Sequence, residues 1–302
     1  MNTEVNTQTK QAIILDGKRV ANELRTCLKG KVAQLIKETG KKPCLAVCLV
    51  GDNPASQVYV RNKEKAANEA GIESISHNLP SNTTQAELTD LIRKLNEDEN
   101  VHGILVQLPL PKGLDTETLL LQINPVKDVD GLHPFNLGMI LAGHPNLIPC
   151  TPFGVMRLLK AYNISPAGKK VVVLGRSRLV GKPIAQLLLN ADATVTTVHS
   201  KTPQAYLEQV VKESDIVVAA IGKANYVKAD WLKEDAVIID VGINRLESGK
   251  LVGDVDFEEA VKKAAAITPV PGGIGPLTVA HLLLNTVKAF EIKCFGFSSI
   301  EL

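Results

Sequence analysis

The sequence has few aromatic residues, almost no net charge and no long apolar run. Phenylalanine, tryptophan and tyrosine make up 4% of the 302 residues, so an aromatic surface that stacks on nucleic-acid bases is not expected. Lysine and arginine number 34 against 32 acids, which gives a net charge of +2 and argues against a nucleic-acid partner recognised by a general basic field. No segment approaches the ~20 apolar residues that cross a bilayer. The composition remains compatible with a small anionic ligand held by a few local charges.

Cysteine is also sparse, and its spacing excludes a C-x-x-C metal or redox motif. The five residues are Cys27, Cys44, Cys48, Cys150 and Cys294. An odd number without close pairs predicts buried free thiols in a reducing compartment, with no metal site. The first ten residues, MNTEVNTQTK, lack the apolar core of a signal peptide. We therefore expect a cytoplasmic protein with no membrane partner.

The sequence does contain two series of alternating strands and helices. An amphipathic segment that Asp16 is placed to cap runs to Gly40. Apolar runs then predict strands at 45–50, 74–79 and 101–107, with helices at 55–70 and 84–97 between them. This order predicts a parallel sheet covered by helices.

A proline-rich stretch separates the two series and predicts loops at a passage between domains. Its prolines are Pro109, Pro111, Pro125, Pro134, Pro145, Pro149 and Pro152. The second series predicts strands at 170–174, 194–198, 216–221, 237–241 and 266–268, and helices at 182–190, 204–213, 256–264 and 277–290. We expect the last helix to pack back onto the first domain. The predicted fold is thus two α/β domains, one formed by 11–150 plus 277–302 and a Rossmann-type domain at 151–276.

A glycine-containing turn, GRSRLVGKP at 175–183, follows a predicted strand and precedes a helix. Glycines at such a junction let the backbone approach a phosphate at the helix N-terminus, although a tight strand-to-helix connection also explains them. The next strand ends in Ser200 and Lys201, where an NAD site places an acid for the ribose hydroxyls. With Arg176 nearby, these groups favour the 2′-phosphate of NADP.

Two polar motifs of the first series are candidates for chemistry. Tyr59 and Lys63 lie four residues apart on one helix face, which suits either a lysine base beside a substrate-stacking aromatic or a surface lysine beside a half-buried tyrosine. Gln107 ends a buried strand, where open α/β sheets bind ligands, but it also suits a glutamine that satisfies loop backbone groups.

Two loops complete the candidates. In KDVDGLHP, one carboxylate is suited to the edge of an amidine-like heterocycle, while Asp128 and Gly131 also fit an ordinary turn. The segment PVPGGIGPLT, which begins at Pro269, is rich in proline and glycine and leads into a helix, so its backbone N–H groups are available to a ligand.

In this order, YVRNK, VQLPLP, KDVDGLHP, GRSRLVGKP with the later HSKT, and PVPGGIGPLT resemble the bifunctional methylenetetrahydrofolate dehydrogenase/cyclohydrolase family over residues 12–292. Ile274 and Leu277 stand where valine and methionine are common. The resemblance is to the short form of the family without a formyl-ligase domain. It implies tetrahydrofolate substrates, NADP, one-carbon metabolism that serves purine biosynthesis, a homodimer, and an active-site cleft between the two domains.

The resemblance also implies roles for individual residues. Lys63 is implied as the catalytic lysine, held by Gln107, with Tyr59 stacked on the folate and Asp130 on the pterin edge. Further substrate contacts are implied at Val106, Leu108, Pro271, Gly272, Gly273, Ile274, Gly275, Pro276, Leu277 and Thr278. Cofactor contacts are implied at Gly175, Arg176, Ser177, Ser200 and Ile243.

The implied reaction oxidises 5,10-methylenetetrahydrofolate to the methenyl cation with NADP⁺ and hydrolyses that cation to 10-formyltetrahydrofolate. Two alternatives are another NADP-dependent Rossmann oxidoreductase and a non-catalytic NADP-binding regulator. The first lacks support because no His/Asp pair or arginine clamp accompanies the glycine turn. The second predicts NADP binding without turnover.

Overall fold

The computed structural model describes residues 11–300. The chain forms two compact units, each with its own parallel sheet. The six-stranded unit comprises 11–17 and 158–275, and the three-stranded unit comprises 18–157 and 276–300. The cleft expected between the two domains stays a prediction.

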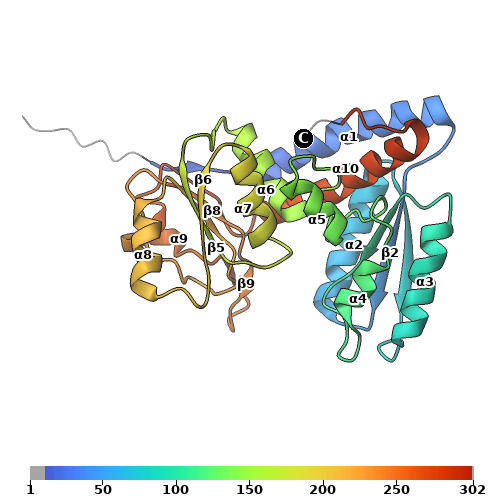
Figure 1. Ribbon diagram of the computed structural model, residues 1–302, viewed down its shortest axis with the longest axis horizontal. Helices are drawn as coiled ribbons and strands as arrows, with labels where there is room; N and C mark the ends of the chain where they lie inside the picture. The colour runs from blue at the N-terminus through green and yellow to red at the C-terminus, as the bar shows by residue number, and fades with distance from the viewer. Residues whose placement is uncertain (1–10, 301–302) are drawn as a thin grey trace, which may run out of the picture. The chain divides into compact units, whose positions relative to one another are not determined.

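The sheet of the three-stranded unit has the order β3-β2-β4, and all its strands are parallel. The central strand β2 (Cys44–Val50) is buried along its whole length, between β3 (Glu73–Leu79) and β4 (Gly103–Val106). Helices α2 (Pro54–Glu69) and α3 (Gln85–Glu97) connect the strands and lie on opposite sides of the sheet (Figure 1). Both faces of β2 are therefore covered, which explains its continuous apolar sequence.

Both connecting helices begin where side chains cap them. The Asn53 side chain accepts hydrogen bonds from Ala55 N and Ser56 N at the start of α2, just before Pro54. At the start of α3, Thr84 and Glu87 form a reciprocal capping box. These caps satisfy helix N–H groups that otherwise lack partners.

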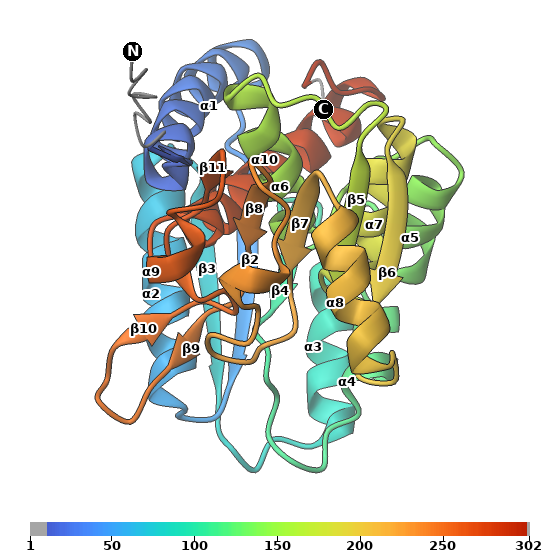
Figure 2. The ribbon, with the colours of Figure 1, turned by 90° about the vertical axis from the view of Figure 1, so that its left-hand side faces the viewer.

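The six-stranded unit has the strand order β1-β11-β8-β7-β5-β6, and every neighbouring pair is parallel. Its strands are β1 (Ile13–Ile14), β5 (Lys170–Leu174), β6 (Thr194–Val198), β7 (Ile216–Ala219), β8 (Val237–Asp240) and β11 (Ala266–Ile267). Helices α7 (Gly181–Asn190) and α8 (Gln204–Glu213) cover opposite faces (Figure 2). The chain crosses from one side of β5 to the other between β6 and β7, which makes a Rossmann-type switch point beside β5. The predicted α/β class with a Rossmann-type domain is confirmed.

The proline-rich stretch contains three helices that sequence analysis did not predict. They are α4 (Thr116–Leu121), α5 (Pro134–Leu141) and α6 (Cys150–Ala161). Pro134 and Pro152 both fall in first turns, where a helix needs no backbone N–H from proline. Proline density therefore marked helix starts here, and the expectation of loops alone was wrong.

The chain ends also differ from the predicted domain limits. Ile13 and Ile14 pair with β11 of the six-stranded sheet, whereas we expected residue 11 onward in the first domain. The long helix α1 (Gly17–Thr39) follows, and α10 (Ile274–Phe295) begins three residues earlier than predicted. From residue 276 onward, α10 belongs to the three-stranded unit.

The remaining elements are short. They are η1 (Ala229–Trp231), α9 (Phe257–Ala260) and an antiparallel hairpin of β9 (Asn244–Arg245) and β10 (Leu251–Val252). All five cysteines are free, but Cys27 is exposed rather than buried. Among residues 11–300, no helix combines the length and apolar character needed to span a membrane.

Candidate functional site

The three-stranded unit brings Lys63 and Gln107 into direct contact. Lys63 lies in α2, and Gln107 directly follows β4. Lys63 Nζ donates to Gln107 Oε1 at 2.9 Å, while Gln107 Nε2 donates to Leu108 O at 2.6 Å. Because the amide nitrogen is engaged by its own loop, the amide oxygen faces the lysine. The predicted pairing of these two residues is therefore present, and it lies at the carboxyl end of a parallel strand.

The charges of Asp130 and Lys63 both act on Cys150, the first residue of α6. The Cys150 thiol is buried and donates to Val129 O at 3.3 Å. Its pKa is raised well above the usual value, first by burial and then by the charge of Asp130, while the charge of Lys63 lowers it. Cys150 is therefore a neutral thiol within electrostatic reach of both residues. No motif in the sequence pointed to Cys150 as part of this group.

The two residues that open the Asp130 loop, Lys127 and Asp128, fix its position. Lys127 is buried, and its Nζ donates to Leu95 O, Asn96 O and Asp98 O at 2.9, 2.7 and 2.8 Å, which satisfies carbonyls at the end of α3. Burial raises the pKa of Asp128, although its carboxylate accepts from His133 N and Asn136 Nδ2. Asp128 also forms a parallel bridge with Ile104 of β4. The turn chemistry considered for Asp128 is therefore present, and it fixes the backbone two residues before Asp130.

Gly131 and Asn285 bring the Asp130 loop against the segment that carries Cys150. Gly131 has φ +72°, and a Cβ there would lie 2.5 Å from the Ile148 carbonyl carbon and Pro149 N, so only glycine permits this approach. Asn285 of α10 is wholly buried, and its Nδ2 donates to Val129 O and Ile148 O, both at 2.8 Å. One amide thus joins the residues that precede Asp130 and Cys150.

The other predicted substrate contacts in this unit differ in accessibility. Tyr59 precedes Lys63 by one turn of α2 and is 48% exposed, so its ring is available to a ligand. Leu108 is half-buried and packs against the unit's core, and Val106 is buried in that core. Of these three residues Tyr59 has an exposed side chain, and the substrate contacts of Val106 and Leu108 stay predictions.

The segment 271–278 is split between the two units rather than being one loop. Pro271, Gly272, Gly273, Ile274 and Gly275 belong to the six-stranded unit, and Pro276, Leu277 and Thr278 belong to the other. From Ile274 onward the segment is already helical. Leu277 is fully buried, and a Cβ on Gly154 of α6 would lie 3.0 Å from its Cβ. Thr278 Oγ1 lies 2.9 Å from Thr151 Oγ1. Leu277 thus packs against α6, and its predicted contact with substrate stays a prediction.

The six-stranded unit has a pocket at the carboxyl ends of β5, β6 and β7, which is the switch point of its sheet. The cavity measures about 390 Å³. Gly175, Arg176, Ser177 and Ser200, four of the five predicted cofactor residues, line it. Open α/β sheets bind dinucleotides at this place.

Two glycines shape the turn between β5 and α7. Gly175 has φ +120°, and a Cβ there would lie 2.2 Å from Ala220 O; at Gly181 a Cβ would lie 2.3 Å from Gly175 O. Any side chain at either position would push β7 or α7 away. The Ser177 hydroxyl accepts from Val180 N at 3.2 Å and from Gly181 N at 3.3 Å, and so closes the turn that precedes α7. Ser177 therefore also stabilises the turn in which it was predicted to bind cofactor.

The polar groups of this pocket fit a phosphorylated ribose. Arg176 and Ser200 line it, and no carboxylate is among its lining residues. Lys201, which we expected beside the phosphate, does not line the pocket, whereas Lys223 does. Lys223 Nζ lies 5.2 Å from the centre of the Tyr226 ring. Lys223 was not predicted from the sequence, although its place just beyond β7 is where such sheets bind ligands.

Ile243, the fifth predicted cofactor residue, lies outside the residues that line this pocket. Its side chain is 48% exposed, and a Cβ on Gly275 would lie 3.5 Å from Ile243 Cδ1. Ile243 therefore lies beside the glycine-rich segment within the six-stranded unit. A predicted cofactor residue therefore lies near a predicted substrate residue.

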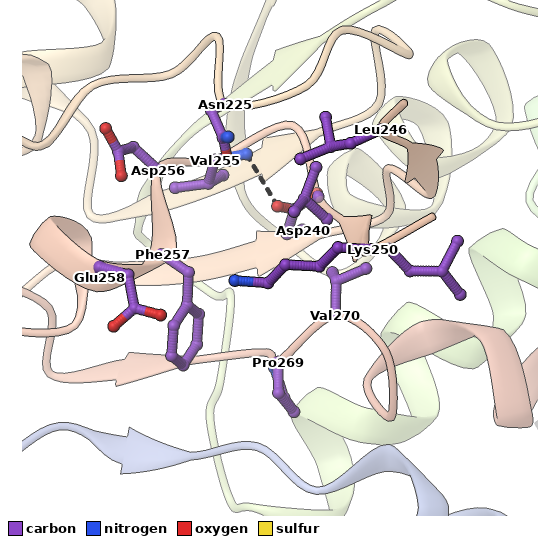
Figure 3. A pocket seen from close by; sticks show the side chains of 13 residues that line it. Asn225, Asp240, Leu246, Lys250, Val255, Asp256, Phe257, Glu258, Pro269 and Val270 are labelled. Atoms are coloured by element: carbon purple, nitrogen blue, oxygen red, sulfur yellow. Dashed lines mark hydrogen bonds between the residues drawn. The ribbon is translucent and has the colours of Figure 1, made fainter. Parts of the chain in front are cut away.

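A second pocket of about 310 Å³ lies beside α9 in the same unit. Figure 3 shows Lys250, Phe257 and Val270 around it, with Asp240 at its inner wall. Val255 N donates to Asp240 Oδ2 at 2.8 Å. None of the residues predicted to bind substrate or cofactor lines this second pocket.

Comparison with known proteins matches both parts of the chain to one family. The catalytic domain of tetrahydrofolate dehydrogenase/cyclohydrolase matches residues 15–130, and the NAD(P)-binding domain of the same enzyme matches residues 149–294. The chain belongs to the tetrahydrofolate dehydrogenase/cyclohydrolase family. Membership in this family decides against the two alternative functions considered from sequence.

Individual relatives agree over nearly the whole chain. A protein of Campylobacter concisus (strain 13826) named "Bifunctional protein FolD" is 55% identical over 280 residues, which is 93% of this chain and 98% of the relative. The FolD crystal structure from Campylobacter jejuni has a TM-score of 0.90 at 52% identity and covers 92% of this chain and 98% of its own. The Trypanosoma brucei FolD structure, which is complexed with NADP and an inhibitor, has a TM-score of 0.91 at 44% identity and covers 94% and 99%.

Proposed function

We propose that this chain oxidises 5,10-methylenetetrahydrofolate to 5,10-methenyltetrahydrofolate with NADP⁺ and then hydrolyses the product to 10-formyltetrahydrofolate. It is a bifunctional dehydrogenase and cyclohydrolase of one-carbon metabolism. The observation that carries the proposal is the 2.9 Å hydrogen bond between Lys63 and Gln107 at the carboxyl end of β4.

The oxidation needs binding and orientation more than proton transfer. Bound NADP⁺ supplies the acceptor for the hydride of the one-carbon bridge. Loss of that hydride leaves an amidinium cation whose charge two nitrogens share, so no side chain has to act as a base. The residues proposed to hold the cofactor are those that line the pocket beside β5, with Arg176 and Ser200 on the 2′-phosphate.

The hydrolysis does need proton transfer, and Lys63 is placed for it. Water that attacks the methenyl carbon must lose a proton, and one ring nitrogen must gain a proton as the bridge opens. Gln107 holds the Lys63 amine in place through an uncharged amide oxygen. We assign proton transfer to Lys63 and orientation of its amine to Gln107.

Asp130 and Tyr59 are proposed to bind the folate. A carboxylate can accept two parallel hydrogen bonds from an amidine-like edge, as the pterin presents. Asp130 follows the buried Asp128 and Val129 and is only half-buried, so its carboxylate is accessible. The exposed Tyr59 ring offers a face for stacking.

The Lys63→Met variant tests this assignment. Because methionine keeps the aliphatic length but cannot carry a proton, we expect methenyltetrahydrofolate hydrolysis to fall by at least ~100-fold. NADP affinity, measured by calorimetry, should be unchanged. Lys65→Met is the matched control, since Lys65 is an exposed lysine on the same helix with only a 3.9 Å contact to Glu69. Hydrolysis by Lys63→Met at the wild-type rate would exclude the assigned role.

Three further properties complete the proposal: a homodimer, a cytoplasmic location and supply of one-carbon units to purine biosynthesis. They are supported by the resemblance to the family. Light scattering on purified protein tests the dimer, because a mass near 32.5 kDa would mean a monomer. Equal turnover with NAD⁺ and NADP⁺ would contradict the preference assigned to Arg176 and Ser200.

A further inference from the structure

Asp254 fills a ring of backbone donors just behind the cofactor pocket. Its side chain is 0% exposed. Oδ2 accepts from Ile221 N at 2.7 Å and Gly222 N at 2.9 Å, and Oδ1 accepts from Lys223 N at 2.9 Å. Three successive N–H groups that point at one centre form an anion-binding concavity. Here the anion is a carboxylate of the chain itself.

The same carboxylate also reaches the segment that carries Ile243. Asn244 Nδ2 donates to Asp254 Oδ1 at 2.9 Å. Gly242 leaves room for this arrangement, since a Cβ there would lie 2.2 Å from Asp254 Oδ1. Asp254 thus connects the loop after β7 with the start of β9. These two segments hold the pocket residues Ile221 and Lys223 and the predicted cofactor contact Ile243.

A second buried carboxylate, that of Asp240, binds the backbone around Asp254. Asp240 is 3% exposed, and its Oδ1 accepts from Gly242 N at 2.9 Å and from Asp254 N at 3.0 Å. Its Oδ2 accepts from Val255 N (Figure 3). A Cβ on Gly253 would lie 1.9 Å from Asp240 Oδ2. The backbone around Asp254 is therefore fixed on both sides, so its carboxylate has one available position.

We propose that Asp254 is a positioning residue for NADP, which acts by holding Ile221, Gly222 and Lys223 as the wall of the cofactor pocket. Because it is fully buried, Asp254 acts through these backbone groups and through Asn244 rather than by contact. Its loss leaves three converging N–H groups without an acceptor, so the loop changes shape and the pocket with it. This inference rests on the proposed NADP-dependent oxidation.

The Asp254→Asn variant gives the direct test. Asparagine keeps the shape but turns an NH₂ group toward backbone N–H donors, so part of the ring loses its acceptor. We expect the KM for NADP⁺ in the dehydrogenase reaction to rise by ~10-fold or more, from the loss of one or two charge-assisted hydrogen bonds. Hydrolysis of added methenyltetrahydrofolate without NADP should stay within about twofold of wild type, since Lys63 and Gln107 belong to the other unit. A role in overall stability alone would lower both activities together.

Asp215→Asn is the matched control. Asp215 also accepts a backbone N–H, from Lys170 at 2.9 Å, and pairs with Lys233, but it lies at the amino ends of β5 and β7. NADP affinity should be unchanged in this variant. If Asp254→Asn does not fold, Asn244→Ala removes a single contact to the same carboxylate, and we expect NADP affinity to fall by about two- to fivefold.

Calorimetric titration of the variants with NADP⁺ separates this inference from the proposed function. Wild-type affinity in Asp254→Asn, or in Asn244→Ala where the first variant is unfolded, would overturn the role of Asp254. Absence of both activities in the wild-type protein would overturn the proposed function instead, and NADP binding would still report on Asp254. A loss of NADP affinity with intact hydrolysis supports the inference.

Discussion

The two units connect their central strands in the same order, but the turns that follow these strands differ. In each, the first strand of a β-α-β-α-β series is central, and the next two strands lie on either side of it, as β3-β2-β4 and β6-β5-β7. The turn after β2 ends in Asn53, whose side chain caps α2. The turn after β5 instead contains Gly175 and Gly181 in close contact with neighbouring backbone. A side chain accepts N–H groups at both helix starts, Asn53 in one unit and Ser177 in the other, but only the second turn depends on two close glycine contacts.

This difference decides which atoms are available to a ligand. In the three-stranded unit, the start of α2 is satisfied internally, and the polar groups that converge are the side chains Lys63 and Gln107. In the six-stranded unit, the pocket is lined by the glycine turn after β5 and by polar residues such as Arg176 and Ser200, and the loop after β7 is held by Asp254. Side chains suit proton transfer, and converging backbone donors suit binding of phosphate or carboxylate. Fold alone does not distinguish these uses.

The largest effect that would sharpen this comparison is expected for Gly175→Ala. A Cβ at this position would meet Ala220 O at 2.2 Å, so the turn after β5 must move. We expect dehydrogenase kcat/KM for NADP⁺ to fall by ~100-fold or more. Hydrolysis of methenyltetrahydrofolate should change little.

Gly168→Ala separates steric overlap from backbone strain in that experiment. Gly168 also has a positive φ, +71°, but nothing lies within 4 Å of its Cβ position. We expect this control to lose ~1 kcal/mol of stability and to keep its NADP affinity. If Gly175→Ala binds NADP as well as Gly168→Ala does, the turn is not the phosphate site.

Asn285→Ala tests the three-stranded unit with a smaller expected effect. The change leaves the buried Ile148 carbonyl without its Asn285 donor and leaves Val129 O with only the weak thiol donor of Cys150, which should cost about 2–4 kcal/mol of unfolding free energy. We expect kcat for hydrolysis to fall by ~10-fold as Asp130 and Cys150 lose their fixed separation. Urea denaturation and the hydrolysis assay measure the two effects.

Thr286→Val is the neighbouring control for Asn285→Ala. The Thr286 hydroxyl is buried as well but donates only to Leu282 O of its own helix, at 2.8 Å. We expect a loss of at most ~1 kcal/mol and normal hydrolysis. An equal loss of hydrolysis in both variants would mean that helix α10 as a whole, and not the Asn285 amide, supports the site.

Strand and helix positions were well predicted where sequence pattern alone decides them. The bounds of β5, β6 and α8 agree with prediction to the residue, because alternation of buried elements leaves a clear periodic signal. The prediction of loops in the proline-rich stretch was wrong because proline in the first turn of a helix removes no helical hydrogen bond. The strand β1 was missed because two residues carry no period and are placed only by pairing with β11.

The candidate site depends even more on contacts between residues far apart in the sequence, which periodicity does not predict. The Lys63–Gln107 pair joins residues 44 positions apart, so the resemblance to a family predicted it and spacing did not. Asn285 bonds to residues 156 and 137 positions away. Asp254 bonds to a loop 31–33 positions away. Such supporting residues lie in ordinary apolar or turn sequences and acquire their role only when the chain is folded.

The smallest expected effect is on the pH dependence of stability. Each unit contains a buried titratable group, and the pKa values of these two groups are shifted in opposite directions. Burial raises the pKa of Asp240 from 3.8 to about 6, so its contribution to stability is present below pH 4 and is lost as pH rises through 6. Burial lowers the pKa of His281 from 6.5 to about 4. The His281 contribution is present above pH 6.5 and is lost as pH falls toward 4. Between its ordinary pKa and its shifted pKa, each group changes the free energy of unfolding by about 1 kcal/mol per pH unit.

Comparison of Asp240→Asn and His281→Gln with wild type isolates the two contributions. Urea denaturation is followed by fluorescence of Trp231, the single tryptophan, which reports the six-stranded unit, and by amide exchange for the other unit. We expect the wild-type advantage over Asp240→Asn to shrink from pH 4 to 6.5 and that over His281→Gln to grow. Asp52→Asn and His144→Gln, which change exposed residues, are the control variants. If the curves of the two buried variants run parallel to wild type, both assignments are contradicted, since burial is the largest cause of each shift.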